Sequence, residues 1–67
     1  MKEKVFNVSG MSCNHCVMAV KEAAEGVEGV ASAEISLEQG TAKVTFSDDV
    51  AESSIVEAIE EEGFKVS

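Results

Sequence analysis

The chain has 67 residues, which is enough for one domain and too few for two. Hydrophobic residues make up 45% of it, a share typical of globular proteins, and no apolar run approaches the roughly 18 residues that cross a membrane. Because 13 acidic residues stand against 5 basic ones, the net charge is −8, which disfavours nucleic acids and anionic membrane surfaces as partners.

The amino end of the chain lacks the apolar segment of a signal peptide, since Val5 and Phe6 lie between charged and polar residues. If the sequence is complete, we expect a cytoplasmic protein without membrane insertion. Cysteines in that compartment are normally reduced.

Alternation of apolar and polar residues predicts strands, and apolar residues three and four apart predict helices. In chain order the patterns predict a strand over 4–8, a loop over 9–12, a helix from Asn14 capped by Gly26, a strand over 30–37, a turn over 38–40, a strand over 41–46, a helix ending at Gly63 and a short strand over 64–66. The second helix can begin at Glu52 or at Ser54, where Ser54 and Glu57 match a capping box.

Two apolar patterns indicate which faces are buried. The stripe on the first helix is formed by Val17, Val20, Ala24 and Val27. In the second strand, we expect an inward face made by Ala31, Ala33, Ile35 and Leu37.

The order strand–helix–strand–strand–helix–strand is that of a split βαβ arrangement. We therefore predict an α+β fold of ferredoxin-like βαββαβ topology, with a four-stranded antiparallel sheet and both helices on one of its faces. The whole chain, residues 1–67, is expected to form this single domain.

The two cysteines, Cys13 and Cys16, lie between the first strand and the first helix. A disulfide across so short a loop would constrain the unfolded chain little, so these cysteines are poor structural staples. The free N–H groups and the dipole at a helix amino terminus favour thiolate over thiol. Two converging thiolates can bind a soft metal ion.

The choice of metal follows from the number and type of ligands. Thiolates select Cu(I), Zn(II) and iron–sulfur clusters, but clusters and structural zinc usually need four ligands. Cys13, Cys16 and His15 supply at most three, and a helical His15 points away from the pair. Positions 12 and 14 are Ser and Asn, so no carboxylate adjoins the cysteines. Two soft ligands without a hard oxygen favour Cu(I).

The main rival is a dithiol redox protein. Thioredoxin-like domains place a cis-proline beside their cysteine pair, whereas this chain has no proline. Haem attachment requires a histidine directly after the second cysteine, where Val17 stands. No catalytic triad or phosphate loop is present, so we expect no enzyme.

From residue 4 to 66 the chain resembles the heavy-metal-associated domains. The resemblance rests on Gly-Met-Ser-Cys-Asn-His-Cys at 10–16, Gly-Val at 29–30, Leu-Glu-Gln-Gly at 37–40 and Ala-Ile-Glu-Glu-Glu-Gly-Phe at 58–64. The family includes small copper chaperones and the amino-terminal domains of copper-transporting P-type ATPases. A 67-residue chain that starts at Met resembles a free bacterial chaperone more than an excised ATPase domain.

This resemblance implies that Cys13 and Cys16 ligate Cu(I) and pass it to a partner by thiolate exchange. It implies a copper-transporting ATPase as recipient, with a copper-responsive repressor as a second candidate. It also implies a monomer without metal and a metal-bridged dimer as a loaded form. Phe64 would pack near the metal loop, where bacterial chaperones often have Tyr and ATPase domains often have Phe.

Three further side chains adjoin the cysteines. Met11 is expected to turn into the core and brace the loop, with ligation as the alternative. His15 is expected to face solvent, with tuning of the site or a cluster shared between two chains as alternatives. Met18 reads equally well as part of an apolar docking rim and as an ordinary helix residue.

Overall fold

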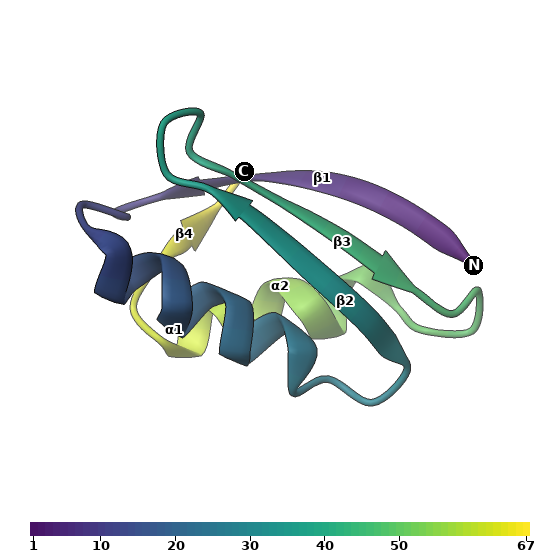
Figure 1. The fold of residues 1–67 in the computed structure, drawn as a ribbon. Helices are drawn as coiled ribbons and strands as arrows, with labels where there is room; N and C mark the ends of the chain where they lie inside the picture. Colours follow the sequence, from purple (N-terminus) through teal and green to yellow (C-terminus); the bar gives the residue numbers. More distant parts are fainter.

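The computed structural model describes residues 1–67, which form a four-stranded sheet covered on one face by two helices (Figure 1). The elements are β1 (Lys2–Ser9), α1 (Asn14–Glu25), β2 (Val30–Ser36), β3 (Thr41–Phe46), α2 (Glu52–Glu61) and β4 (Lys65–Val66). The predicted ferredoxin-like topology is therefore confirmed. Neither helix has the length and apolar character needed to cross a membrane.

The sheet has the strand order β2-β3-β1-β4, and every pairing in it is antiparallel. β1 lies in the middle because it pairs with β3 over residues 2–7 and with β4 at Val8 and Ser9. The carboxyl end of β1 is thereby held on both sides, and it leads directly into the cysteine loop. β2 and β4 are the two edges of the sheet.

The core lies between the sheet and the helices, and it contains apolar side chains only. Phe6, Val8, Val20, Ala24, Ala33, Ala42, Val44, Phe46, Ile55 and Ile59 are its buried members. The helix stripe that the sequence predicts supplies Val20 and Ala24, while Val17 and Val27 are half-buried at its ends. Neither cysteine belongs to the core.

The alternation expected for β2 is wrong at both of its ends. A β-bulge between Val30 and Ser32 leaves Ala31 exposed and turns Val30 toward the core. Beyond the bulge Ala33 is buried and Ile35 is half-buried, as predicted. Leu37 follows the end of the strand and is exposed. One extra residue in a strand shifts the alternation by one position, and a period-two pattern does not record it.

The helix ends also differ from the sequence motifs. α2 begins at Glu52, one of the two predicted starts, and its cap, Ala51, offers no side-chain hydrogen bond, so the capping box of the alternative start at Ser54 does not form. α1 ends at Glu25 and is capped by Gly26 as predicted, but Gly26 has an ordinary right-handed φ of −73°. The chain reverses three residues later at Gly29, whose φ is +96°.

Candidate metal site

The backbone places both cysteines at the amino end of α1. Cys13 is the cap of the helix, with an extended backbone at φ −159° and ψ 174°. Its carbonyl oxygen accepts hydrogen bonds from the Cys16 N–H at 3.0 Å and from the Val17 N–H at 3.2 Å. This first turn brings Cys13, which precedes the helix, and Cys16, its third residue, to the same end of α1.

The two sulfurs lie 3.8 Å apart, at hydrogen-bond distance for sulfur. A metal–thiolate bond measures about 2.3 Å, so one ion can contact both atoms at this separation with a bent arrangement. A linear arrangement needs a separation of about 4.6 Å on the same bond length. Cys13 is exposed, so rotation of its side chain can supply the difference, whereas Cys16 is half-buried.

The pKa of the Cys16 thiol is lowered from its ordinary value. The largest cause is the backbone N–H of Ser12, which stabilises the thiolate by hydrogen bonding, and the side chains of Cys13 and Ser12 act in the same direction. Partial desolvation raises the pKa, and its effect is smaller than that of the Ser12 amide but larger than that of either side chain. The expectation of a favoured thiolate is thus confirmed at Cys16, but the leading cause is an amide of the preceding loop.

Ser12 is the site residue that the sequence reasoning missed. Its hydroxyl lies 3.9 Å from the Cys16 sulfur, in addition to the contribution of its amide. Its position four residues before Cys16, at the boundary between loop and helix, was the available signal.

The metal loop, residues 10–13, is supported on its core side by apolar contacts. Met11 is half-buried and packs against the core, which confirms its predicted bracing position. Gly10 has a φ of +97°, a region that favours glycine, and a β-carbon there would stand 3.6 Å from the Phe64 ring. Phe64 is half-buried at the edge of the core. It therefore adjoins the metal loop, as the resemblance implied.

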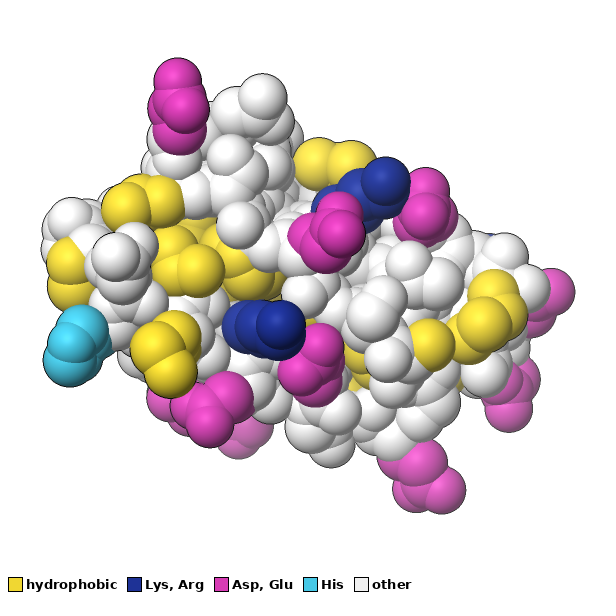
Figure 2. Space-filling model, viewed as in Figure 1, with side chains coloured by type: hydrophobic (Ala, Val, Ile, Leu, Met, Phe, Trp, Pro, Cys, Tyr) yellow, Lys and Arg dark blue, Asp and Glu magenta, His cyan; other side chains and the backbone are white.

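No group of three or more His, Cys, Asp or Glu side chains is placed to hold a metal ion. His15 is exposed, as predicted. Met18 is 61% exposed, and Figure 2 shows hydrophobic side chains gathered between the start of α1 and the β2–β3 hairpin, with acidic side chains around them. The site is a two-thiol loop next to an apolar surface.

Comparison with known proteins identifies the family to which this fold and cysteine loop belong. The profile of the heavy-metal-associated domain matches residues 5–65. The chain belongs to the heavy-metal-associated domain family. It is 45% identical to the copper chaperone CopZ of Staphylococcus aureus (strain bovine RF122 / ET3-1) over 67 residues, which cover 98% of each chain.

Two solved structures of the family share the whole fold. A CopZ metallochaperone superposes with a TM-score of 0.95 and 42% identity, and the match covers 98% of this chain and all of the other. A copper binding domain from HMA7, a P-type ATPase, gives a TM-score of 0.96 and 37% identity, with 100% and 92% covered. The same fold thus occurs in a metallochaperone and in a copper binding domain of a P-type ATPase.

Proposed function

We propose that this chain is a cytosolic Cu(I) metallochaperone whose ligands are Cys13 and Cys16. The observation that carries the proposal is the pair of thiols at the amino end of α1, with sulfurs 3.8 Å apart and no third His, Cys, Asp or Glu side chain placed with them. Zinc usually takes four ligands, whereas soft thiolates suit Cu(I) at low coordination number. Copper is the cargo of the protein, and no bond chemistry is catalysed.

Transfer proceeds by exchange of sulfur ligands on the ion. A thiolate of the recipient forms a bond to the bound Cu(I), which gives an intermediate with three sulfurs. The bond from one cysteine of this chain then breaks, and that sulfur leaves as a thiolate. The exposed Cys13 is the first to be released, because its side chain can rotate into solvent whereas Cys16 is half-buried. A second exchange at Cys16 completes the transfer.

The proposed recipient is a copper-transporting P-type ATPase. The similarity to a copper binding domain of such an ATPase supports this choice, since two domains of one fold can present their cysteine loops to each other. The identity is higher to CopZ, at 45%, than to the ATPase domain, at 37%, which supports a chaperone role. On this proposal the whole chain is a single metal-binding domain.

The decisive experiment is a Cu(I) titration of the reduced protein against a strong competing chelator, with Zn(II) titrated in parallel. We expect tight binding of one Cu(I) per chain and zinc binding weaker by many orders of magnitude. Equal competition by Zn(II) would contradict the copper assignment.

A dithiol redox role is the second candidate, and the closeness of the two sulfurs favours it in the metal-free state. Turnover of the metal-free dithiol by thioredoxin reductase, without tight Cu(I) binding, would support that role. Tight Cu(I) binding without reductase turnover would support the chaperone.

A further inference from the structure

Glu25 stands at a position where an acidic residue is locally unfavourable. It is the last residue of α1, and the last turn of that helix contains no basic residue. The negative end of the helix dipole lies there and repels a carboxylate. No ion pair of the chain includes Glu25, although Lys21 lies one helical turn earlier. Neither helix preference nor charge pairing therefore accounts for this residue.

A hydrogen bond to the sheet does account for it. The Glu25 carboxylate accepts a hydrogen bond from the Ala33 N–H at 3.2 Å, eight residues along the chain. This is the only part-buried hydrogen bond that a side chain makes in the structure, since the other three are exposed. Ala33 itself is only 2% exposed, so its N–H would be costly to leave without an acceptor.

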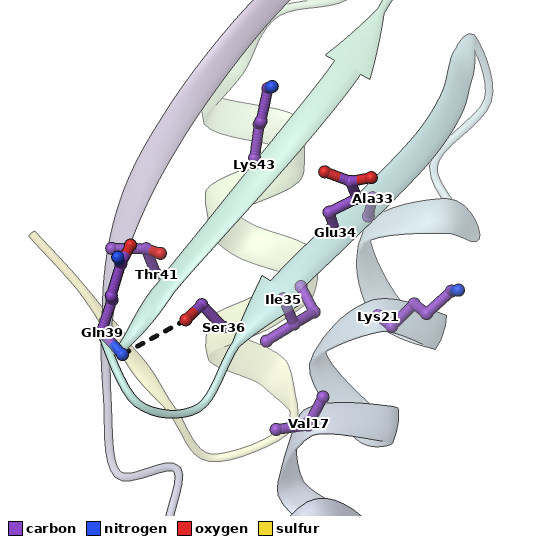
Figure 3. Close-up of a pocket in the computed structure, with 9 residues that line it drawn as sticks. All are labelled: Val17, Lys21, Ala33, Glu34, Ile35, Ser36, Gln39, Thr41 and Lys43. Atoms are coloured by element: carbon purple, nitrogen blue, oxygen red, sulfur yellow. Dashed lines mark hydrogen bonds between the residues drawn. The ribbon is translucent and has the colours of Figure 1, made fainter.

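The Ala33 N–H belongs to an edge of the sheet. β2 has a neighbour on one side only, and Ala33 follows the β-bulge between Val30 and Ser32. Because direction alternates along a strand, Ile35 presents its N–H and C=O to the same outer side as Ala33. A groove of about 550 Å³ reaches both residues, and Figure 3 shows them on β2 with Val17 of α1 opposite. Open strand edges of this kind pair with other strands unless they are blocked.

We propose that the Glu25 carboxylate blocks the β2 edge and thereby keeps this chain from associating with a second copy through β2. The carboxylate occupies the N–H that the carbonyl group of an added strand would need, and the bulge interrupts the edge beside it. A second copy carries the same edge, so two copies without the block can pair antiparallel about a two-fold axis. The inference does not depend on bound copper, because neither cysteine lines the groove.

Three variants of equal net charge separate the hydrogen bond from the charge. Glu25→Gln keeps a side-chain carbonyl oxygen that accepts from the Ala33 N–H, whereas Glu25→Ala keeps none. Glu28→Ala is the matched control, because Glu28 lies nearby and makes no hydrogen bond or ion pair. Both glutamates are exposed and outside the core, and alanine suits a helix end, so all three variants should fold. Far-UV circular dichroism checks this.

Amide hydrogen exchange, followed by NMR on the whole reduced and metal-free chain, tests the hydrogen bond. The rate at Ala33 is taken relative to that at Val44 in β3, so that a change in global stability cancels. We expect Glu25→Ala to raise this ratio at least about tenfold, which corresponds to roughly 1.4 kcal/mol, and Glu25→Gln to raise it about threefold. Glu28→Ala should leave it unchanged.

Sedimentation velocity over a range of protein concentrations tests the block itself. It is run at about 1 M salt, where the Debye length is about 3 Å and repulsion between the acidic chains is screened. Glu25→Ala should self-associate with a dissociation constant at least about tenfold lower than that of Glu28→Ala, and its NMR signals should broaden at Ala33 and Ile35. Glu25→Gln should stay close to the control.

Four outcomes would overturn the proposal. Equal self-association of Glu25→Gln and Glu25→Ala would show that lost charge alone is responsible. An unchanged exchange ratio in Glu25→Ala would show that the hydrogen bond does not protect the Ala33 N–H. Faster exchange without self-association would reduce the contact to a local hydrogen bond, and broadening centred away from β2 would place the association elsewhere.

Discussion

At the scale of single residues, Cys13 and Cys16 are chemically different although the motif presents them as a pair. Cys13 is exposed and caps the helix, while Cys16 is half-buried and receives hydrogen bonds from Ser12. An exposed thiolate is easier for a partner to reach than a half-buried one. On the proposed mechanism, this asymmetry gives transfer an order that two equivalent ligands would lack.

Replacing either cysteine tests the ligand assignment. Cys13→Ser and Cys16→Ser should each abolish tight Cu(I) binding, because one thiolate cannot replace two. Chelator competition measures the loss, and far-UV circular dichroism should show an unchanged fold, since neither side chain lies in the core. Wild-type affinity in either single variant would contradict the assignment.

The lowered pKa of Cys16 predicts its reactivity and the pH dependence of copper binding. In the metal-free protein the Cys16 thiolate should persist to lower pH than in an ordinary cysteine, so site-resolved alkylation at this sulfur should stay fast as the pH falls. Copper binding should release protons and weaken on acidification, because protons compete for the ligand sulfur.

The same chain in denaturing urea is the matched control for the alkylation profile. Unfolding removes the Ser12 hydrogen bonds, so the Cys16 profile should move to higher pH. The folded state binds fewer protons at this site, so the contribution of Cys16 to stability is present above its unfolded pKa and is lost as pH falls through the folded pKa. A profile that stays in place on unfolding would show that the fold does not favour the thiolate.

At the scale of elements, the turn between α1 and β2 depends on Gly29. Its φ of +96° is costly for other residues, and a β-carbon there would collide with the Val50 side chain. Gly63 has nearly the same φ, +98°, but open space around it. The two glycines therefore separate backbone strain from a steric clash.

Gly63→Ala should cost about 1–2 kcal/mol, the usual cost of the left-handed region for an L-residue. Gly29→Ala should cost more, because Val50 must also move. Chemical denaturation of both variants measures the two free energies of unfolding. Equal losses would show that Val50 moves aside without cost.

How much of the fold the sequence predicts depends on the element. The helices and β3 are predictable because their apolar spacing matches one burial face from end to end. The exposure of Ala31 is not, since the bulge depends on how β2 pairs with β3. α2 begins at Glu52, one of the two predicted starts, and the local capping-box motif at Ser54 does not decide between them.

The candidate site divides in the same way. Cys13, Cys16, the inward Met11 and the exposed His15 follow from residue type and position relative to the helix. The effect of Ser12 on Cys16 does not, because it depends on the direction of a loop amide, which no side-chain pattern encodes.

At the scale of the whole molecule, the metal loop and the core consist of different residues and lie in different parts of the fold. The ten buried residues are all apolar and lie between the sheet and the helices, whereas the thiols lie at one end of α1. A structural zinc domain is different, because its ligands hold the chain together and metal removal unfolds it. A carrier that must give up its metal benefits from a fold that stands without it.

This separation predicts that removal of metal leaves the protein folded. Addition of a Cu(I) chelator to the loaded chain should keep the helical circular dichroism and the dispersed NMR spectrum. The melting temperature should fall only to that of the never-loaded chain. A ligand that binds the folded state adds RT ln(1 + [L]/Kd) to the free energy of unfolding, and its removal takes away that contribution alone. The Cys13→Ser/Cys16→Ser double variant should melt near the metal-free temperature and should not respond to Cu(I). An unfolded spectrum in chelator would show that the ion is needed to stabilise the fold. That result would contradict a carrier whose fold is independent of its metal.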